Sequence, residues 1–138
     1  MRNKKRCNRC NKIKLRTQFH KNGKYIKAYC KSCRSKRGRI KNRNKKIEVI
    51  NAYGNKCKCC NEKRIEFLTI DHMKGNGKKH RKEIKAGGTG LYSFLIKNKF
   101  PKNLGLRVLC MNCNWSIGHY GYCPHKKIKE FIKVKGTQ

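Results

Sequence analysis

The sequence predicts a small α+β protein, stapled by metal ions, with a zinc ribbon at its N-terminus and a second zinc-pinned module after it. Ten cysteines occur among 138 residues, and eight of them form four C-x2-C pairs. Only 36% of the residues are hydrophobic, and the formal net charge is +33. Such a chain buries a small core, and small cores generally need disulfides or metal ions.

Whether cysteines form disulfides or bind metal depends on the redox compartment, and a signal peptide at the N-terminus would indicate an oxidising one. "MRNKKRCNRCNK" contains no apolar stretch that could act as a signal peptide. No run of residues approaches the roughly 18 apolar residues of a membrane helix. We therefore expect a protein of the reducing cytosol, or of the host cytosol or nucleoid for a viral protein, where cysteine pairs bind metal more often than they form disulfides.

The first module is a basic four-cysteine zinc ribbon over residues 1–38. Its pattern is C-x2-C-x19-C-x2-C, a spacing typical of a site with four thiolates around one zinc ion. The predicted ligands are Cys7, Cys10, Cys30 and Cys33.

Between these pairs, residues 19–29 alternate apolar and basic side chains around Asn22-Gly23, which predicts a short hairpin. We expect Phe19, Tyr25 and Tyr29 to form a small core around the metal. The alternative is that one exposed ring stacks on nucleic-acid bases.

A basic linker helix is predicted over residues 39–53. Ile40, Ile47, Ile50 and Tyr53 recur at helical spacing, and Gly54 is a suitable stop. The charged side of this helix is either a solvated face or a surface that lies along phosphates.

The second module is predicted over residues 54–125. Its two C-x2-C pairs are 49 residues apart, so further structure is inserted between them. We expect a strand over 65–70, a basic glycine-rich segment, a helix over 89–100 capped by Thr89, a strand over 104–110 and a short helix over 113–121. A basic tail, 126–138, carries a helical pattern. The predicted zinc ligands are Cys57, Cys60, Cys110 and Cys113.

The charge distribution predicts a polyanionic partner. Residues 1–47 contain 20 Lys and Arg and no acidic residue. Nucleic acid, and DNA first, is the expected partner, because phosphate contacts by Lys and Arg release condensed counterions. No long amphipathic stretch indicates a membrane surface.

The chain has a single aspartate, Asp71, and it stands directly before His72 at the end of the predicted strand 65–70. Asn114 directly follows the last C-x2-C pair. Two strands and a helix, pinned by cysteine pairs at both ends, would bring these three residues together. The simpler alternative is that Asp71 ends the strand and caps a turn.

The order of "KCKCC", "IDH", "HRKE", "RVLCMNCNW" and "CPH" resembles the HNH endonucleases, also called ββα-metal nucleases. The similarity is greatest to the zinc-pinned branch that includes the endonuclease VII type of phage junction resolvase, and to uncharacterised phage proteins of this pattern. It covers roughly residues 53–125 and implies a treble-clef-like ββα-metal module.

The resemblance implies a role for each residue of the motif. His72 would be the general base, its second ring nitrogen held by an acceptor such as a backbone carbonyl. Asp71 and Asn114 would bind one catalytic Mg²⁺ or Mn²⁺. A basic side chain among His80, Arg81 and Lys82 would hold the scissile phosphate. Both zinc ions would be structural.

Two positions of the motif depart from the family pattern. The third family letter is often His and is Asn114 here, and Asn is a weaker ligand than His. The family's central asparagine falls at Gly105 here, so Asn103, two residues earlier, would have to support the loop that positions His72. Cys59 is either a spare thiol or, with Cys123 and His125, part of an additional metal site. Trp115 is expected to fill the small core.

The predicted function is therefore a DNA-binding HNH endonuclease or nickase that uses one divalent ion. The alternative is a non-catalytic DNA- or RNA-binding packaging protein on the same scaffold.

Overall fold

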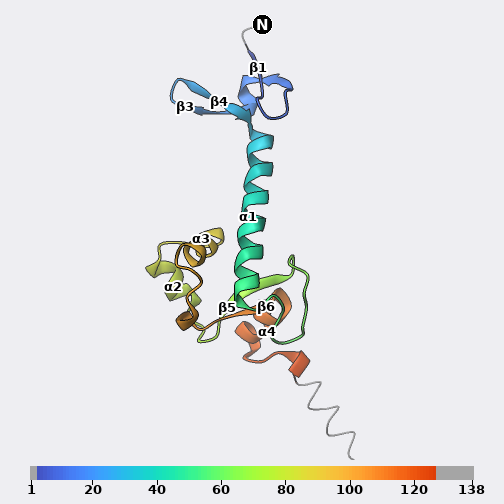
Figure 1. The fold of residues 1–138 in the computed structure, drawn as a ribbon, viewed down its shortest axis with the longest axis vertical. Coiled ribbons are helices and arrows are strands. Elements are labelled where there is room, and N and C mark those ends of the chain that lie inside the picture. The colour runs from blue at the N-terminus through green and yellow to red at the C-terminus, as the bar shows by residue number, and fades with distance from the viewer. Residues whose placement is uncertain (1–2, 127–138) are drawn as a thin grey trace, which may run out of the picture. The chain divides into compact units, whose positions relative to one another are not determined.

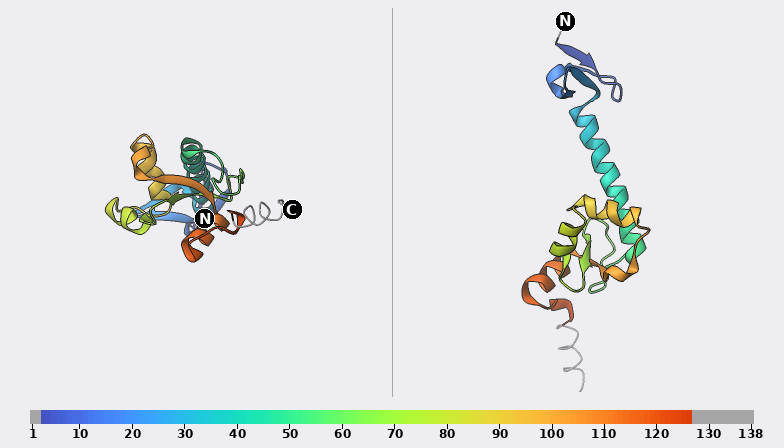
Figure 2. Two further views of the ribbon diagram at one scale, coloured as in Figure 1. Left: turned by 90° about the horizontal axis from the view of Figure 1, so that it is seen from below. Right: turned by 90° about the vertical axis from the view of Figure 1, so that its left-hand side faces the viewer.

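The computed structural model describes residues 3–126 of the chain, which divides into two compact units, 1–44 and 45–138. Each unit combines one or two short antiparallel sheets with helices, so the predicted α+β class is confirmed (Figures 1 and 2). The helix predicted in the tail lies beyond residue 126, outside the described residues.

The first unit contains two hairpins. Strands β1 (Lys4–Arg6) and β2 (Ile13–Leu15) form one, and a 3-10 turn, η1 (Arg16–Gln18), leads to the other, β3 (Phe19–Asn22) and β4 (Tyr25–Cys30). The second hairpin is the predicted one, and Gly23 has the positive φ of +57° that its turn requires. No sequence pattern predicted β1 and β2, because each strand has only three residues.

The metal-centred core predicted for this unit is smaller than expected. Phe19 is buried beside Cys7 and Cys30, but Tyr25 is 81% exposed and Tyr29 is 42% exposed. The prediction was wrong for both tyrosines because side chains alternate along a strand. The β4 face that carries Cys30 turns inward, and the tyrosines lie on the other face.

Helix α1 (Lys31–Tyr53) starts directly after Cys30, eight residues before the predicted start, and ends before Gly54 as predicted. Its buried residues all lie near its C-terminal end: Val49, Ile50 and Tyr53. Ile40, by contrast, is 47% exposed, although the helical spacing placed it on the same face.

The second unit is built on one hairpin followed by a helix. Strand β5 (Leu68–His72) pairs with β6 (Leu106–Cys110), and α4 (Met111–Tyr120) follows β6 without a break. Between the strands lie α2 (Gly77–Glu83), α3 (Thr89–Lys97) and the 3-10 turn η2 (Lys102–Leu104). The core joins the end of α1, both strands and α3, through apolar side chains of Val49, Ile50, Leu68, Ile70, Leu91, Leu95, Leu106, Val108 and Leu109.

Several details of the second unit differ from the prediction. Both strands start two or three residues later than expected, and α2 occupies part of the segment read as a glycine-rich loop. Gly88 stands at the N-cap of α3, so Thr89 is the first helical residue and makes no capping hydrogen bond. Trp115 is 60% exposed and does not fill the core.

Each unit contains one group of four clustered cysteines. The sulfurs of Cys7, Cys10, Cys30 and Cys33 lie within 4.8 Å of one another, and so do those of Cys57, Cys60, Cys110 and Cys113. A tetrahedron of sulfurs bound to zinc at about 2.3 Å has edges of about 3.8 Å. The Cys60 and Cys110 sulfurs, 3.6 Å apart, match that edge. Both groups therefore fit structural zinc.

Both four-cysteine groups are assembled in the same way. The first pair of each forms a turn closed by an asparagine with positive φ, Asn11 (54°) or Asn61 (63°). The second pair spans the junction of a strand and a helix, β4 with α1 or β6 with α4. The last two thiols of each group therefore sit at a helix N-terminus, where the helix dipole favours the anionic thiolate.

Hydrogen bonds in the first group favour the thiolate of Cys30, whereas the hydrogen bond with Cys30 raises the pKa of Cys33 to about 12. The Ser32 side chain lies 3.2 Å from the Cys30 sulfur, and this contact, with the Cys33 backbone N–H, lowers the pKa of the Cys30 thiol to about 5. Zinc binds the deprotonated form.

In the described residues, no helix has the length and apolar character needed to cross a membrane.

We predict that zinc removal unfolds the first unit. Among the described residues of this unit, Phe19 is the single buried apolar side chain apart from the cysteines. Structural zinc contributes about 10–16 kcal/mol in small zinc domains, as much as the whole stability of many domains. A chelator under reducing conditions should collapse the dispersed amide resonances of residues 3–30 in a ¹H–¹⁵N spectrum. Zinc, but not magnesium, should restore them. Dispersed resonances in the zinc-free chain would contradict this prediction.

Candidate functional site

Asp71 and His72 end strand β5 and point to opposite faces of the hairpin. His72 pairs in register with Leu106 and is buried on the core face with Leu68 and Ile70. Asp71 pairs with Arg107 on the other face. The Arg107 Nε donates to Asp71 Oδ2 over 2.6 Å, and both side chains are largely buried, 23% and 16% exposed. The only aspartate of the chain is therefore held by a cation.

The His72 imidazole bonds to a second imidazole. His72 Nε2 lies 2.8 Å from His80 Nδ1, where a backbone carbonyl had been expected. His80, on α2, is 8% exposed and packs edge-on against Phe94 of α3. Burial lowers the pKa of His72, and the charges of His80 and Arg81 lower it further, against a smaller opposing effect of Asp71. These effects favour the neutral imidazole of His72, the form that can accept a proton.

The other ring nitrogen of His72 faces the start of α2. A Cβ placed on Gly77 would lie 2.9 Å from His72 Nδ1 and 3.1 Å from the Arg81 guanidinium. The absent side chain of Gly77 therefore lets the start of α2 pack directly against the His72 ring and the Arg81 side chain. If Nε2 donates its hydrogen to His80, Nδ1 carries the lone pair and faces the start of α2.

Asn114 lies half-buried near the N-terminus of α4. The Cys110 sulfur accepts the Cys113 backbone N–H at 3.4 Å and so fixes the start of that helix. Helix α4 contacts both β5 and β6. The hairpin that carries Asp71 and His72 therefore packs against the helix that carries Asn114. A metal ion shared by these three residues stays a prediction.

The remaining predicted site residues are on the surface. Arg81 and Lys82 are exposed on α2, in contrast to the buried His80. Asn103 is exposed on η2. The loop before β6 is tied to the end of β5 by the backbone, where the Met73 N–H donates to the Gly105 carbonyl over 2.9 Å. Gly105 has a φ of +61°, so a glycine at the position of the family's asparagine has a conformational reason.

A basic groove lies in the first unit, between β4 and the start of α1. Side chains from the first cysteine turn, from β4 and from α1 line it: Arg9, Lys27, Tyr29, Arg34, Arg37 and Lys41. In α1, Arg37 and Lys41 are four residues apart, as are Arg39 and Arg43. Like charges at this spacing repel on a helix. An anion bound along α1 would relieve that repulsion.

An exposed aromatic surface lies on α4 and the residues after it. Trp115 stacks on His119 with ring centroids 4.7 Å apart and an interplanar angle of 15°. Tyr120 meets both rings edge-on, and Tyr122 lies 6.3 Å from Tyr120. Four exposed rings on a basic protein resemble the platforms on which single-stranded bases stack.

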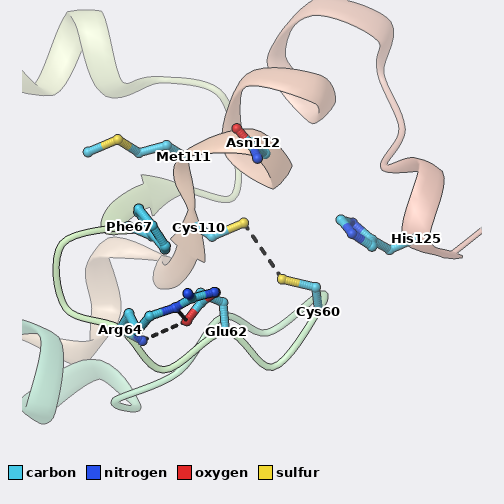
Figure 3. A pocket seen from close by; sticks show the side chains of 8 residues that line it. All are labelled: Cys60, Glu62, Arg64, Phe67, Cys110, Met111, Asn112 and His125. Carbon is cyan, nitrogen blue, oxygen red and sulfur yellow. Dashed lines mark hydrogen bonds and ion pairs between the residues drawn. The ribbon is translucent and has the colours of Figure 1, made fainter.

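The additional metal site left open by the sequence has a structural counterpart. Donor atoms of Cys59, Cys123 and His125 gather with that of Cys113. His125 lines one pocket together with Cys60 and Cys110 of the zinc group (Figure 3). No sequence signal would have placed Cys113 in both groups, because the contact depends on the path of the chain after α4.

Comparison of the chain with protein-family models, with curated proteins and with solved structures finds no match.

Proposed function

We propose that the chain is a zinc-stapled HNH-type endonuclease or nickase that acts on nucleic acid, most directly DNA. The observation that carries the proposal is the order of parts in the second unit. Asp71 and His72 end the first strand of an antiparallel hairpin, and Cys110, Cys113 and Asn114 start the helix that follows the second strand. Four clustered thiols pin both ends of this arrangement.

In this proposal His72 is the general base. A water oxygen forms a bond to phosphorus while the P–O3′ bond breaks, and the water proton passes to Nδ1 of His72. The hydrogen bond to His80 orients the ring. Arg81, exposed on α2, would contact a phosphate oxygen.

Asp71 and Asn114 would hold a divalent cation through oxygen atoms, the ligand type that Mg²⁺ and Mn²⁺ prefer. Such a cation supplies positive charge for the transition state and for the departing oxygen. Asp71 Oδ2 already accepts from Arg107, so Oδ1 is the oxygen available for it.

The basic groove and the aromatic surface support nucleic acid as the partner. Cationic side chains of the groove suit the phosphate backbone, and the stacked rings suit unpaired bases. Neither contact reads base edges, so the two surfaces position the substrate without selecting a sequence.

The Asp71–Arg107 ion pair favours a second candidate, a nucleic-acid-binding protein without catalysis. In that case the carboxylate stabilises the hairpin and needs no cation. Removal of Asp71 would then leave nucleic-acid binding intact, and no cleavage would be found for the wild type.

We predict that His72→Ala and Asp71→Asn each abolish nicking of supercoiled plasmid in Mg²⁺ or Mn²⁺. Loss of a general base costs about 10²–10⁴-fold in rate. His20→Ala, which changes an exposed histidine of the first unit, is the matched control and should cut as the wild type does. Zinc content is measured for each variant so that misfolding is recognised. Intact plasmid with the zinc-loaded wild type would favour the binding protein.

We predict that Gly77→Ala also reduces nicking strongly while the chain stays folded. The added methyl group would lie 2.9 Å from His72 Nδ1 and would displace the ring of the proposed base. Gly87→Ala is the matched control, since a Cβ there meets nothing within 4 Å. Equal nicking rates for the two variants would exclude Nδ1 as the base.

We predict that nucleic-acid binding weakens steeply with salt. The observed affinity should fall by about 0.9 decade per decade of salt for each phosphate contacted. Changing Arg34, Arg37 and Lys41 together to alanine should lower that slope by up to about three. The same substitution at Lys56, Lys63 and Lys97, exposed on the second unit, is the charge-matched control. Affinity that does not change with salt would remove nucleic acid as the partner.

A further inference from the structure

The second unit contains a third group of metal-binding side chains, and it shares one member with the four-cysteine group. The sulfurs of Cys59, Cys113 and Cys123 and a ring nitrogen of His125 all lie within 4.8 Å of one another. Cys113 belongs to both groups. It is fully buried, and its sulfur lies within 4.8 Å of the other donor atoms of both groups.

The distances in this group match those around a tetrahedral zinc ion. His125 Nδ1 lies 3.4 Å from the Cys113 sulfur and 3.3 Å from the Cys123 sulfur. Zinc bonds of about 2.3 Å to sulfur and about 2.0–2.1 Å to nitrogen give tetrahedral S–N edges of about 3.6 Å. Three sulfurs and one nitrogen form a common structural zinc set.

The chain after α4 is shaped to return to this point. Gly121 ends the helix in the left-handed conformation, with a φ of +76°. The next residues bring Cys123 to 3% exposure against the second unit's core, and the Lys126 N–H donates to the Cys123 carbonyl to close a turn around His125. Cys59 belongs to the first cysteine turn of the second unit, between Cys57 and Cys60.

We propose that the second unit binds two zinc ions bridged by the Cys113 thiolate. One ion takes Cys57, Cys60, Cys110 and Cys113, and the other takes Cys113, Cys59, Cys123 and His125. With the ion of the first unit, the chain holds three zinc ions, one for each group. All ten cysteines are then metal ligands.

The charge of the bridged pair is reasonable for this protein. Binding of the second ion releases two protons, from Cys59 and Cys123, and neutral His125 binds through Nδ1. The two ions carry four positive charges and the six thiolates six negative charges, so the pair has a net charge of −2. A single ion with four thiolates has the same net charge, and a chain of net charge +33 stabilises either anion.

The bridged pair would anchor the segment after α4 to the cysteine turn before β5. It therefore fixes α4 at both ends, at Cys113 in its first turn and at Cys123 beyond its last. A disulfide between two of these thiols is the competing arrangement, and the described chain has all ten cysteines free.

Zinc and thiol content of the full-length protein, purified with zinc and without chelator, test the proposal. We expect three zinc ions per chain by elemental analysis and ten free thiols after denaturation in chelator. Cys123→Ser and His125→Ala should each bind one zinc ion fewer, whereas His20→Ala, an exposed histidine outside the three groups, should keep the wild-type content. Two ions with ten thiols, or two ions with eight thiols, would overturn the proposal.

The bridge itself is tested on the wild type, so that the result does not depend on the folding of a variant. After exchange of zinc for ¹¹³Cd, we expect three resonances, one of them shifted upfield as nitrogen replaces a sulfur ligand. Two of the three should show scalar coupling to each other through the Cys113 sulfur. Three uncoupled resonances, or fewer than three, would contradict a shared thiolate.

Discussion

Both units depend on a group of four clustered cysteines whose sulfurs are placed to bind one structural metal ion. The chain has a net charge of +33 and few apolar side chains, so hydrophobic burial alone opposes a large repulsion. The first unit buries Phe19 and two cysteine side chains, and the second has a modest core shared among α1, α3 and one hairpin. In each unit four cysteines join a turn to the start of a helix, and the metal contributes stability that packing does not supply.

The same constraint sets the geometry of the candidate site. Cysteines at the end of β6 and in the first turn of α4 fix where the hairpin stops and the helix starts. Register with β6 then places His72 on the core face and Asp71 on the opposite face. The two side chains therefore have different surroundings. His72 is buried and lies within hydrogen-bond distance of His80, and Asp71 accepts a hydrogen bond from Arg107. An acid held by a cation and a neutral imidazole are compatible with phosphodiester hydrolysis, and the guanidinium weakens the site's attraction for a further cation.

Spacing in the sequence predicted the parts of the fold that depend on local chemistry. The two four-cysteine groups, the β3–β4 hairpin and the end of α1 before Gly54 follow from C-x2-C pairs, an Asn-Gly turn and helical periodicity. Contacts between distant segments were not predictable in this way. His80 was expected to contact a phosphate because its sequence neighbours are basic. Nothing in that local sequence predicts its packing on Phe94, which is distant in the chain. Trp115 looked like a core residue because a large apolar ring usually is one, and its stacking on His119 depends on helix α4. The sharing of Cys113 depends on the turn after that helix.

The proposed function joins these features: zinc holds a strand, its partner and a helix so that residues 43 positions apart, Asp71 and Asn114, serve one cation. Paramagnetic broadening by Mn²⁺ in the zinc-loaded protein measures that directly. Low Mn²⁺ concentrations should first broaden the amide resonances of Asp71, His72 and Asn114, while those of residues 3–30 stay sharp. Broadening that leaves Asn114 unaffected while Asp71 is broadened, or that avoids both, would contradict a shared cation site.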